Sequence, residues 1–467
     1  MKKLSAVLLL MLVAQLNLFA QQYHLTFKQL KEYEGLYEFM SHTRLSMAVS
    51  PRDSTLYLII NQARYAIKPS APDVFLNAQK QPITFLRNST HLVSGYISGK
   101  DTFKILNRKV VFPKEMWYPR LVADPQHYHY KYSIPDALKD GLPVGDVTAA
   151  GLDSALLDTM VNKIVAGVYP NVHSVLIIKD GKLVFEQYFY EFTRDSVQAQ
   201  RSATKSAISA LSGIAISQGI IKSVNEKVLP YFPEIHFDNL SELKSRITIH
   251  DLLSNQSGVS MDEAYSKAAG NEMEMGYTDD WIKYTFSLPM LDTPGTVGRY
   301  NSGNPITMGR IIEKASGMPL KQFAIKNLYG PMGITNFQWD FRPDRSNAEN
   351  FCQLFLRPRD MAKFGLLYLN GGVWQGKQLV PASWVTESTR KQSVVQGVDY
   401  GYLWWLKHLD SKGVRYYGKA AQGNGGQKIY IFSQQQMVVV ITGGNYNSQS
   451  PSDQLIKTYI LPAFNKK

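Results

Sequence analysis

The sequence predicts an α+β protein in which an antiparallel sheet is flanked by helices, carries a helical subdomain and is preceded by a small β-rich domain. Two predicted hairpins, at 175–188 and 428–442, lie far apart in the chain and enclose mainly helical and irregular sequence. Short, partly alternating runs separated by turn residues fill 21–118. The hairpins predict the sheet, the sequence between them the helical subdomain, and the short runs the β-rich domain.

The chain has 467 residues, enough for two domains. We divide it into a signal peptide at 1–20, a β-rich accessory domain at 21–118, a linker at 119–149 and the main domain at 150–467.

The first twenty residues are typical of a secretory signal. Lys2 and Lys3 precede an apolar run that extends to Phe19, and Ala20 supplies a small residue for cleavage. No cysteine follows the run, and no other segment is long and apolar enough to span a bilayer. We therefore expect an exported protein without a transmembrane anchor, periplasmic or secreted.

The composition excludes several classes of protein. Hydrophobic residues make up 44% of the chain and aromatic residues 12%, as in an ordinary folded protein. The formal charge of +13 is scattered, which favours a cationic surface over nucleic-acid binding. Cys352 is the only cysteine, so we expect neither internal disulfides nor a structural zinc site. We expect no metal and no organic cofactor, and the sequence gives no oligomeric state.

The β-rich domain is predicted from strand-like runs at 56–60, 63–67, 83–86 and 102–106. A structural or substrate-shaping appendage is favoured over an independent lipid binder. The linker that follows is rich in Pro, Tyr and His. Its His-Tyr-His-Tyr cluster at 127–130 lacks carboxylate or cysteine partners, which favours a surface segment over a metal site.

A candidate nucleophile opens the helical part of the main domain. Ser202 precedes Lys205 by three residues, so on a helix the two side chains share one face. An amine whose pKa is lowered by burial or by a neighbouring cation can take the serine proton. The unpaired N–H groups at the start of the helix would stabilise an oxyanion. Ser202 and Lys205 are therefore predicted to be catalytic.

The same Ser-x-x-Lys spacing occurs at Ser241/Lys244 and at Ser388/Lys391. These pairs lie in polar or charged stretches, whereas Ser202 opens the apolar run 207–219. The context therefore selects Ser202.

A second element is the Tyr-x-Ser of Tyr300 and Ser302, on a predicted tight loop. A phenol whose pKa is lowered beside Lys205 can carry the proton from Ser202 to the leaving group. Tyr446-Asn447-Ser448 has the same pattern but follows the last predicted strand, where an exposed loop is expected.

A third element is the glycine-rich stretch Gly423–Gln427, which leads into the strand at 428–432. Glycines at a strand edge let a substrate carbonyl approach closely. A backbone N–H from this stretch, together with that of Ser202, would form a two-donor oxyanion hole. A glycine-rich hairpin entry without a catalytic role is the alternative.

In this order the three elements resemble the serine β-lactamase and penicillin-recognising hydrolase family, in its class C, D-Ala-D-Ala carboxypeptidase, esterase and 6-aminohexanoate-dimer hydrolase branch. The resemblance covers roughly 150–465, with support from the stretches 247–258, 293–295, 357–365 and 400–405. The β-rich part resembles the small barrel-like accessory domains of some bacterial serine hydrolases.

The resemblance implies a β-lactamase/transpeptidase-like fold and a role for each motif residue. It makes Ser202 the acylated nucleophile, Lys205 its activating base and Tyr300 the proton-transferring partner, with Ser302 at the Tyr-x-Asn/Ser position. Gln427 would supply the second oxyanion N–H, after the Lys/His-x-Gly position that is filled here by Asn424, Gly425 and Gly426.

Asn424 is the clearest departure from the family pattern, because lactam-hydrolysing members carry a cation there that helps recognise the substrate carboxylate. Its loss predicts poor hydrolysis of anionic penicillins and favours neutral or differently charged esters and amides. Arg299 or Lys428 could supply the missing charge instead.

The leading hypothesis is an exported serine hydrolase that cleaves a small-molecule or short-peptide ester or amide through an acyl-enzyme. The alternative within the enzyme class is a D,D-peptidase or β-lactamase, and the rival from another class is a non-hydrolytic protein that binds cell-wall peptides. A Ser-His-Asp triad is disfavoured, because no Gly-x-Ser-x-Gly elbow is present and His250 is adjacent to Asp251.

Overall fold

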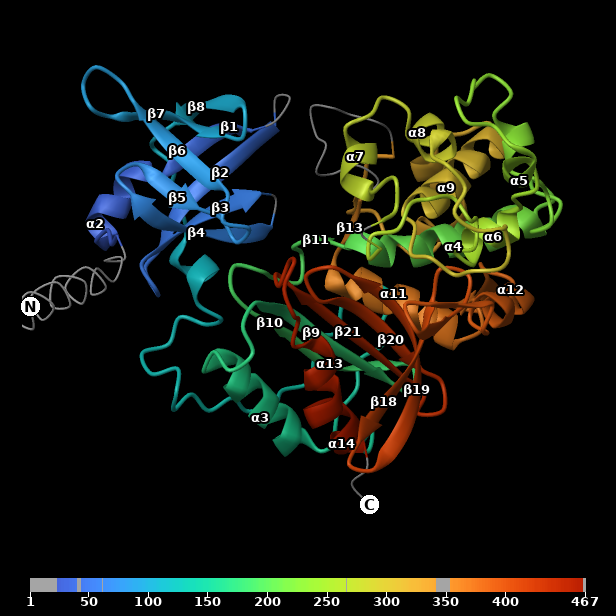
Figure 1. Cartoon of the computed structure of the whole chain (residues 1–467). Coiled ribbons are helices and arrows are strands. Elements are labelled where there is room, and N and C mark those ends of the chain that lie inside the picture. Colours follow the sequence, from blue (N-terminus) through green and yellow to red (C-terminus); the bar gives the residue numbers. More distant parts are fainter. Residues whose placement is uncertain (1–22, 40–42, 61, 266, 342–352, 465–467) are drawn as a thin grey trace, which may run out of the picture. The chain divides into compact units, whose positions relative to one another are not determined.

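The computed structural model describes residues 23–39, 43–60, 62–265, 267–341 and 353–464. The predicted signal peptide and Cys352 lie outside the described residues. The chain forms two compact units, Met1–Phe112 and Pro113–Lys467, and each is described by itself (Figure 1).

The first unit is a closed antiparallel barrel in which each strand pairs with the next and β1 pairs with β8. Closure leaves no free sheet edge. The β-rich character predicted for this region is confirmed, and the four predicted runs lie in β3, β4, β6 and β8. The barrel consists of β1 (Gly35–Phe39), β2 (Thr43–Ser50), β3 (Thr55–Ile60), β4 (Ala63–Ala71), β5 (Val74–Leu76), β6 (Pro82–Arg87), β7 (Val93–Ser98) and β8 (Asp101–Asn107), after the short helix α2 (Phe27–Leu30).

Aromatic side chains fill the interior of this barrel. Tyr33 packs against Phe75 and Phe85 with ring centroids 4.9 and 4.6 Å apart, and Tyr37 meets Tyr96 edge-on at 5.6 Å. All five rings are buried. Edge-to-face aromatic packing of this kind makes the barrel interior a hydrophobic core.

The second unit is built on one antiparallel sheet with the strand order β10-β9-β21-β20-β19-β18-β17-β16. The first predicted hairpin, β9 and β10, turns at Asp180 and Gly181, which both have the positive φ that a type I′ turn requires. It joins the second predicted hairpin, β20 and β21, through the pairing of Val175 with Ile441. The strands are β9 (Val172–Lys179), β10 (Lys182–Tyr188), β16 (Ser393–Val395), β17 (Val398–Tyr400), β18 (Trp405–Ser411), β19 (Val414–Gly423), β20 (Gln427–Phe432) and β21 (Met437–Gly443).

Helices cover both faces of this sheet, as the α+β prediction requires (Figure 1). On one face α11 (Pro358–Leu369) packs against β9, β20 and β21, and Gly365 allows close contact because an added Cβ would collide with Val438. On the other face α3 (Ser154–Val165) packs against the C-terminal α14 (Leu461–Phe464). The fold prediction is confirmed for this unit.

The helical subdomain lies between the two hairpins in sequence, next to α4 (Thr204–Ser217). Its helix α9 packs against α4, α6 and α8. Its helices are α5 (Glu242–Ser245), α6 (Ile249–Leu253), α7 (Glu272–Gly276), α8 (Trp281–Ser287), α9 (Gly303–Ser316) and α10 (Leu320–Ala324). Further short elements are α12 (Ala382–Ser388), α13 (Ser452–Leu455), β11 (Gln198–Ala199), β12 (Gln338–Trp339), β13 (Leu354–Leu356), β14 (Val373–Trp374) and β15 (Lys377–Gln378).

Residues 119–149, predicted as a surface linker, belong to the second unit and pack on it. The Tyr132 hydroxyl donates a hydrogen bond to the Val184 carbonyl at 3.0 Å, and Leu142 and Val147 are buried in the core of this unit. Arg359 of α11 pairs with Asp140 at 3.0 Å. Few regular elements form here, but side chains anchor the segment.

Within the described parts of the chain, none of the helices is both long and apolar enough to cross a membrane.

Candidate active site

The candidate nucleophile lies in a single 3₁₀ turn, Arg201–Ala203, that leads directly into α4. Pairing of β11 with β13 brings the chain to this turn. The Lys205 ammonium donates a hydrogen bond to Ser202 Oγ at 3.0 Å. Because the helix is buried on nearly all sides from Thr204 to Ala215, its N-terminus holds both side chains in a fixed frame.

The Lys205 side chain is almost fully buried beneath Tyr300. Its ammonium lies 5.0 Å from the centroid of the Tyr300 ring, and 8% of the residue is exposed. Burial lowers the pKa of Lys205, but the proximity of Tyr300, Glu272 and Glu263 raises it, and the net pKa lies above the usual lysine value. The lowered pKa considered for a lysine base is therefore not found, and the ammonium remains charged at neutral pH.

Tyr300 and Ser302 lie just before α9, across the site from α4. The Tyr300 ring packs on Trp405 of β18 with centroids 5.5 Å apart. The Ser302 hydroxyl is buried and donates a 2.5 Å hydrogen bond to Glu272 Oε2 of α7. The structure thus brings Ser202, Lys205 and Tyr300 together from distant parts of the chain, while Ser302 is bound to a carboxylate.

Two carboxylates near this site were missed in the sequence. The backbone N–H of Glu272 donates a hydrogen bond to Glu263 Oε1 at 3.1 Å, so the Glu263 carboxylate lies beside Glu272. Burial of the Glu263 carboxylate away from water is the larger cause, and repulsion from Glu272 the next, of a pKa of Glu263 that is raised to about 7. Both residues lie in a stretch of short elements without a recognisable motif, so no sequence signal could have found them.

The glycine-rich turn between β19 and β20 contacts the nucleophile turn through Gly423. An added Cβ at Gly423 would collide with the Gln200 carbonyl oxygen and lie 3.1 Å from the Ser202 backbone nitrogen. Only a residue without a side chain lets β19 approach the nucleophile so closely. Gly423 begins the glycine-rich stretch singled out in the sequence, but no role of its own was predicted for it.

The other residues of this turn point elsewhere. Gln427, in β20, is fully buried and donates from its side-chain amide to the Gly443 carbonyl at 2.6 Å. Asn424 is exposed and donates from Nδ2 to Asn447 Oδ1 at 2.7 Å. The structure therefore brings Gly423 against the nucleophile, while the side chains of Gln427 and Asn424 bind elsewhere. The prediction for Gln427 concerns its backbone N–H, and this residue pairs with Gly423 between β20 and β19.

Gly425 and Gly426 shape the turn. Their φ angles of 90° and 98° are unfavourable for residues with a side chain. Added Cβ atoms would collide with Tyr446 at Gly425 and with Ser450 at Gly426. Both glycines thus allow the segment after β21 to pack against the turn.

The competing sequence patterns have structural roles. Ser241 is the N-cap of α5, and the Ser388 hydroxyl donates to the Val385 carbonyl. His250 Nδ1 lies 2.8 Å from the Tyr402 hydroxyl, while Asp251 completes the capping box of α6. Each of these side chains is occupied away from Ser202.

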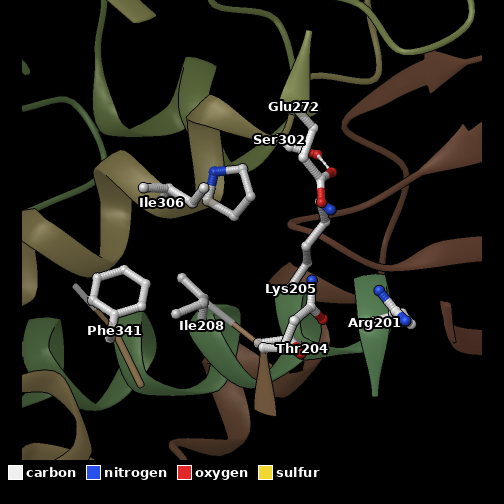
Figure 2. Close-up of a pocket in the computed structure, with 10 residues that line it drawn as sticks. Arg201, Thr204, Lys205, Ile208, Glu272, Ser302, Ile306 and Phe341 are labelled. Carbon is white, nitrogen blue, oxygen red and sulfur yellow. Dashed lines mark hydrogen bonds between the residues drawn. The ribbon is translucent and has the colours of Figure 1, made fainter. Parts of the chain in front are cut away.

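A small pocket of about 30 Å³ adjoins Lys205 between α4 and α9 (Figure 2). Figure 2 shows an apolar wall on one side, and the Lys205 side chain and the Ser302–Glu272 hydrogen bond on the other. The lining residues are Arg201, Thr204, Lys205, Ile208, Glu272, Ser302, Pro305, Ile306, Phe341 and Gln353. Over the described ranges of the chain, no group of three or more His, Cys, Asp or Glu side chains could hold a metal ion.

The second unit is similar to known proteins. Residues 157–459 match the family model described as beta-lactamase. The chain is 25% identical over 216 residues to "N-acetylmuramyl-L-alanine amidase" of Bacillus subtilis (strain 168), covering 41% of this chain and 48% of that protein. It is 25% identical over 202 residues to "Putative D-alanyl-D-alanine carboxypeptidase" of Escherichia coli (strain K12), covering 38% of this chain and 45% of that protein. The chain thus spans about half the length of the curated relatives it matches.

A solved structure shares the fold of the second unit. The "putative beta-lactamase from Bacteroides dorei DSM 17855" superposes with a TM-score of 0.54 at 19% identity, covering 68% of this chain and 100% of that chain.

Proposed function

The chain belongs to the beta-lactamase family, and on this premise we propose that it is an exported serine hydrolase that cleaves an ester or amide through an acyl-enzyme on Ser202. The observation that carries the proposal is the 3.0 Å hydrogen bond from Lys205 to Ser202 Oγ, with Tyr300 packed over the same ammonium. A nucleophile within hydrogen-bond reach of a proton-transfer group is the arrangement that covalent catalysis requires.

In the acylation step, Ser202 Oγ forms a bond with the substrate carbonyl carbon, and the bond to the leaving group breaks when the tetrahedral intermediate collapses. The Lys205–Tyr300 pair takes the serine proton and passes it to the leaving group. Because the raised pKa of Lys205 keeps its resting proton on the amine, we assign the acceptor role to the Tyr300 oxygen in its phenolate form, which the neighbouring ammonium stabilises. The phenolate takes the Ser202 proton, becomes a neutral phenol, and gives that proton to the leaving group.

In the deacylation step, water attacks the acyl carbon, releases the carboxylic acid and returns the proton to Ser202. Backbone N–H groups stabilise the oxyanion in both steps, and each such donor contributes about 2.7–4 kcal/mol. We propose the Ser202 N–H as one donor and a backbone N–H at the end of β19, near Gly423, as the other. The predicted donor Gln427 remains a second candidate.

A D,D-peptidase or β-lactamase activity is the second candidate function. The name of the Escherichia coli relative favours it. The side chain at position 424 disfavours good β-lactam hydrolysis, because Asn424 is uncharged and bound to Asn447. A non-hydrolytic protein that binds cell-wall peptides is the remaining rival.

Intact-protein mass spectrometry tests the proposal on the wild type, Ser202→Ala and Ser241→Ala. Ser241 belongs to another Ser-x-x-Lys pair and caps α5, so Ser241→Ala is a matched control. The probes are a fluorophosphonate, 4-nitrophenyl butyrate and benzylpenicillin. We expect adducts and nitrophenol release that require Ser202 but not Ser241, with little penicillin hydrolysis.

Other outcomes would redirect the assignment. Stable acylation by benzylpenicillin would favour the peptidase, and the absence of any Ser202-dependent adduct would favour the binding protein. Export is tested by the N-terminus of the protein secreted from cells, which we expect at Gln21.

A further inference from the structure

Asn424, at the position where the family resemblance implies a cation, is bound to a neighbouring loop. Asn424 Oδ1 accepts a hydrogen bond from the Asn447 backbone N–H at 2.9 Å, in addition to the bond between the two side chains. This double link fixes the segment that follows β21. Asn424 thus holds a loop in place and leaves recognition of substrate charge to another residue.

Two cations suggested by the sequence are already occupied. Arg299 pairs with Asp292 at 2.5 Å and lies 3.7 Å from Asp262. Lys428 donates to Gln422 at 2.8 Å and lies 3.3 Å from Asp453, and burial lowers its pKa. Neither side chain is available for a substrate carboxylate.

Arg201 is a second cation in the pocket, besides Lys205. It directly precedes Ser202, lines the same pocket as Lys205, and has a φ of 48°, in the left-handed region that residues other than glycine rarely adopt. Its Nε is buried, and neither a hydrogen-bond acceptor for Nε nor a carboxylate for the guanidinium is found among the described residues. An unusual backbone conformation thus places beside the nucleophile a guanidinium that has no anionic partner among the residues that the structure describes.

The Arg201 guanidinium is held by an aromatic ring. It lies 4.7 Å from the centroid of the Tyr446 ring, and the Gly425 backbone packs so closely on this ring that an added Cβ would be 2.6 Å from it. Stacking on a ring leaves the N–H edge of a guanidinium free to bind a carboxylate with two parallel hydrogen bonds. The Asn424–Asn447 hydrogen bonds therefore help to hold the Tyr446 ring, the platform on which the Arg201 guanidinium stacks.

We propose that Arg201 binds a carboxylate of the substrate, so that the preferred substrates are open-chain esters or amides that carry a free carboxylate near the scissile bond. Penicillins stay poor substrates, because lactam-hydrolysing members recognise their carboxylate from the position that Asn424 fills here. This inference rests on the proposed function, since it concerns the same site. Glu272, the acidic residue of this pocket, is bound to Ser302, and Figure 2 shows this pair and Arg201 at separate places on the wall. A carboxylate at Arg201 thus meets a cation that pairs with no carboxylate in the described part of the chain.

Two pairs of esters test the proposal and distinguish the two sides of the scissile bond. In one pair, 4-nitrophenyl hydrogen succinate carries the carboxylate on the acyl side, and 4-nitrophenyl methyl succinate is its neutral partner. In the other, 3-carboxyphenyl butyrate carries it on the leaving group, and its methyl ester is the neutral partner. The measured quantity is the ratio of kcat/KM for the anionic ester to that for its neutral partner.

We expect wild type to prefer the anionic ester in at least one pair. Arg201→Met should lower that ratio about 10- to 100-fold, the range for loss of a charge-assisted hydrogen bond, and Arg201→Lys should lower it less. The matched control is Arg415→Met, which removes a cation from β19 that pairs with Asp410 away from the pocket. The control should leave the ratio unchanged. A ratio that Arg201→Met does not alter would overturn the proposal.

A binding measurement separates this proposal from the proposed function. If none of the esters shows Ser202-dependent turnover, the proposed function fails. Calorimetry of the anionic esters with Ser202→Ala then still tests Arg201: tighter binding than of the neutral partners, lost on adding Arg201→Met, supports carboxylate recognition. Equal binding of charged and neutral esters refutes it.

Discussion

Replacing Gly423 with alanine tests whether catalysis by Ser202 depends on the close packing of the end of β19 against the nucleophile turn. The added methyl would overlap the Gln200 carbonyl oxygen by about 1 Å relative to an ordinary contact, and it would lie 3.0 Å from Arg201 Cβ. The atoms it meets belong to the backbone or to its first side-chain carbon, so they cannot rotate away. The strand and the nucleophile turn must therefore move apart by about 1 Å.

A misplacement of that size at reacting groups costs about 100-fold in rate. This corresponds to about 2.7 kcal/mol of transition-state stabilisation, comparable to one oxyanion donor. We therefore expect Gly423→Ala to lower kcat for 4-nitrophenyl butyrate by about 100-fold, measured as the initial rate of nitrophenol release. Thermal unfolding, followed by circular dichroism, shows whether the variant is folded.

Gly145→Ala is the matched control. Its added methyl would meet Lys182 side-chain atoms at 3.1 and 3.3 Å, and this flexible side chain can move aside. The control should keep wild-type kcat. A folded Gly423→Ala enzyme with kcat within threefold of wild type would refute the role of β19, and it would return the second oxyanion donor to Gln427.

Three further substitutions probe the charge, the platform and the packing of the site. Glu272→Gln removes an anion that raises the pKa of Lys205, so this pKa should fall and the alkaline limb of the kcat/KM profile should move to lower pH. An unmoved limb would show that the ionisation of Lys205 does not control the alkaline loss of activity. Tyr446→Leu removes the ring beneath Arg201 and should lower the preference for anionic esters about threefold to tenfold, whereas Tyr446→Phe should retain it; equal ratios in both variants would exclude the ring as a platform. Gly213→Ala would place a methyl against the indole ring of α12 and should lower the free energy of unfolding by about 1–3 kcal/mol in urea titrations; unchanged stability would mean that the helices separate freely.

The sequence predicts the fold well where local signals are strong. The Asp180-Gly181 turn identifies one hairpin, and the apolar run behind Ser202 identifies the central helix. Barrel closure could not be predicted, because the pairing of Leu36 with Asn107 joins segments about seventy residues apart. Alternating runs show that strands form but not which strands meet.

The residues of the candidate site also differ in how far the sequence predicts their contacts. Ser202 and Lys205 are linked by helical geometry over three residues, so their spacing predicts their hydrogen bond. Tyr300 was proposed from its Tyr-x-Ser motif and supported by the family resemblance, but its approach to Lys205 depends on the packing of α9 against α4 and could not be predicted from spacing. Glu272 had no such signal, since its role arises only where α7 meets Ser302.

The charges around the nucleophile turn support a separation of roles between its two cations. Lys205 lies near Glu272 and Glu263, which raise its pKa and partly offset its charge, so we assign this cation to proton transfer. Arg201 rests on the Tyr446 ring, which attracts a cation but does not neutralise it. An incoming carboxylate would compete with Glu272 at Lys205 but would complete the charge balance at Arg201. A substrate carboxylate can therefore be recognised one residue from Ser202 without altering the charges that activate the nucleophile.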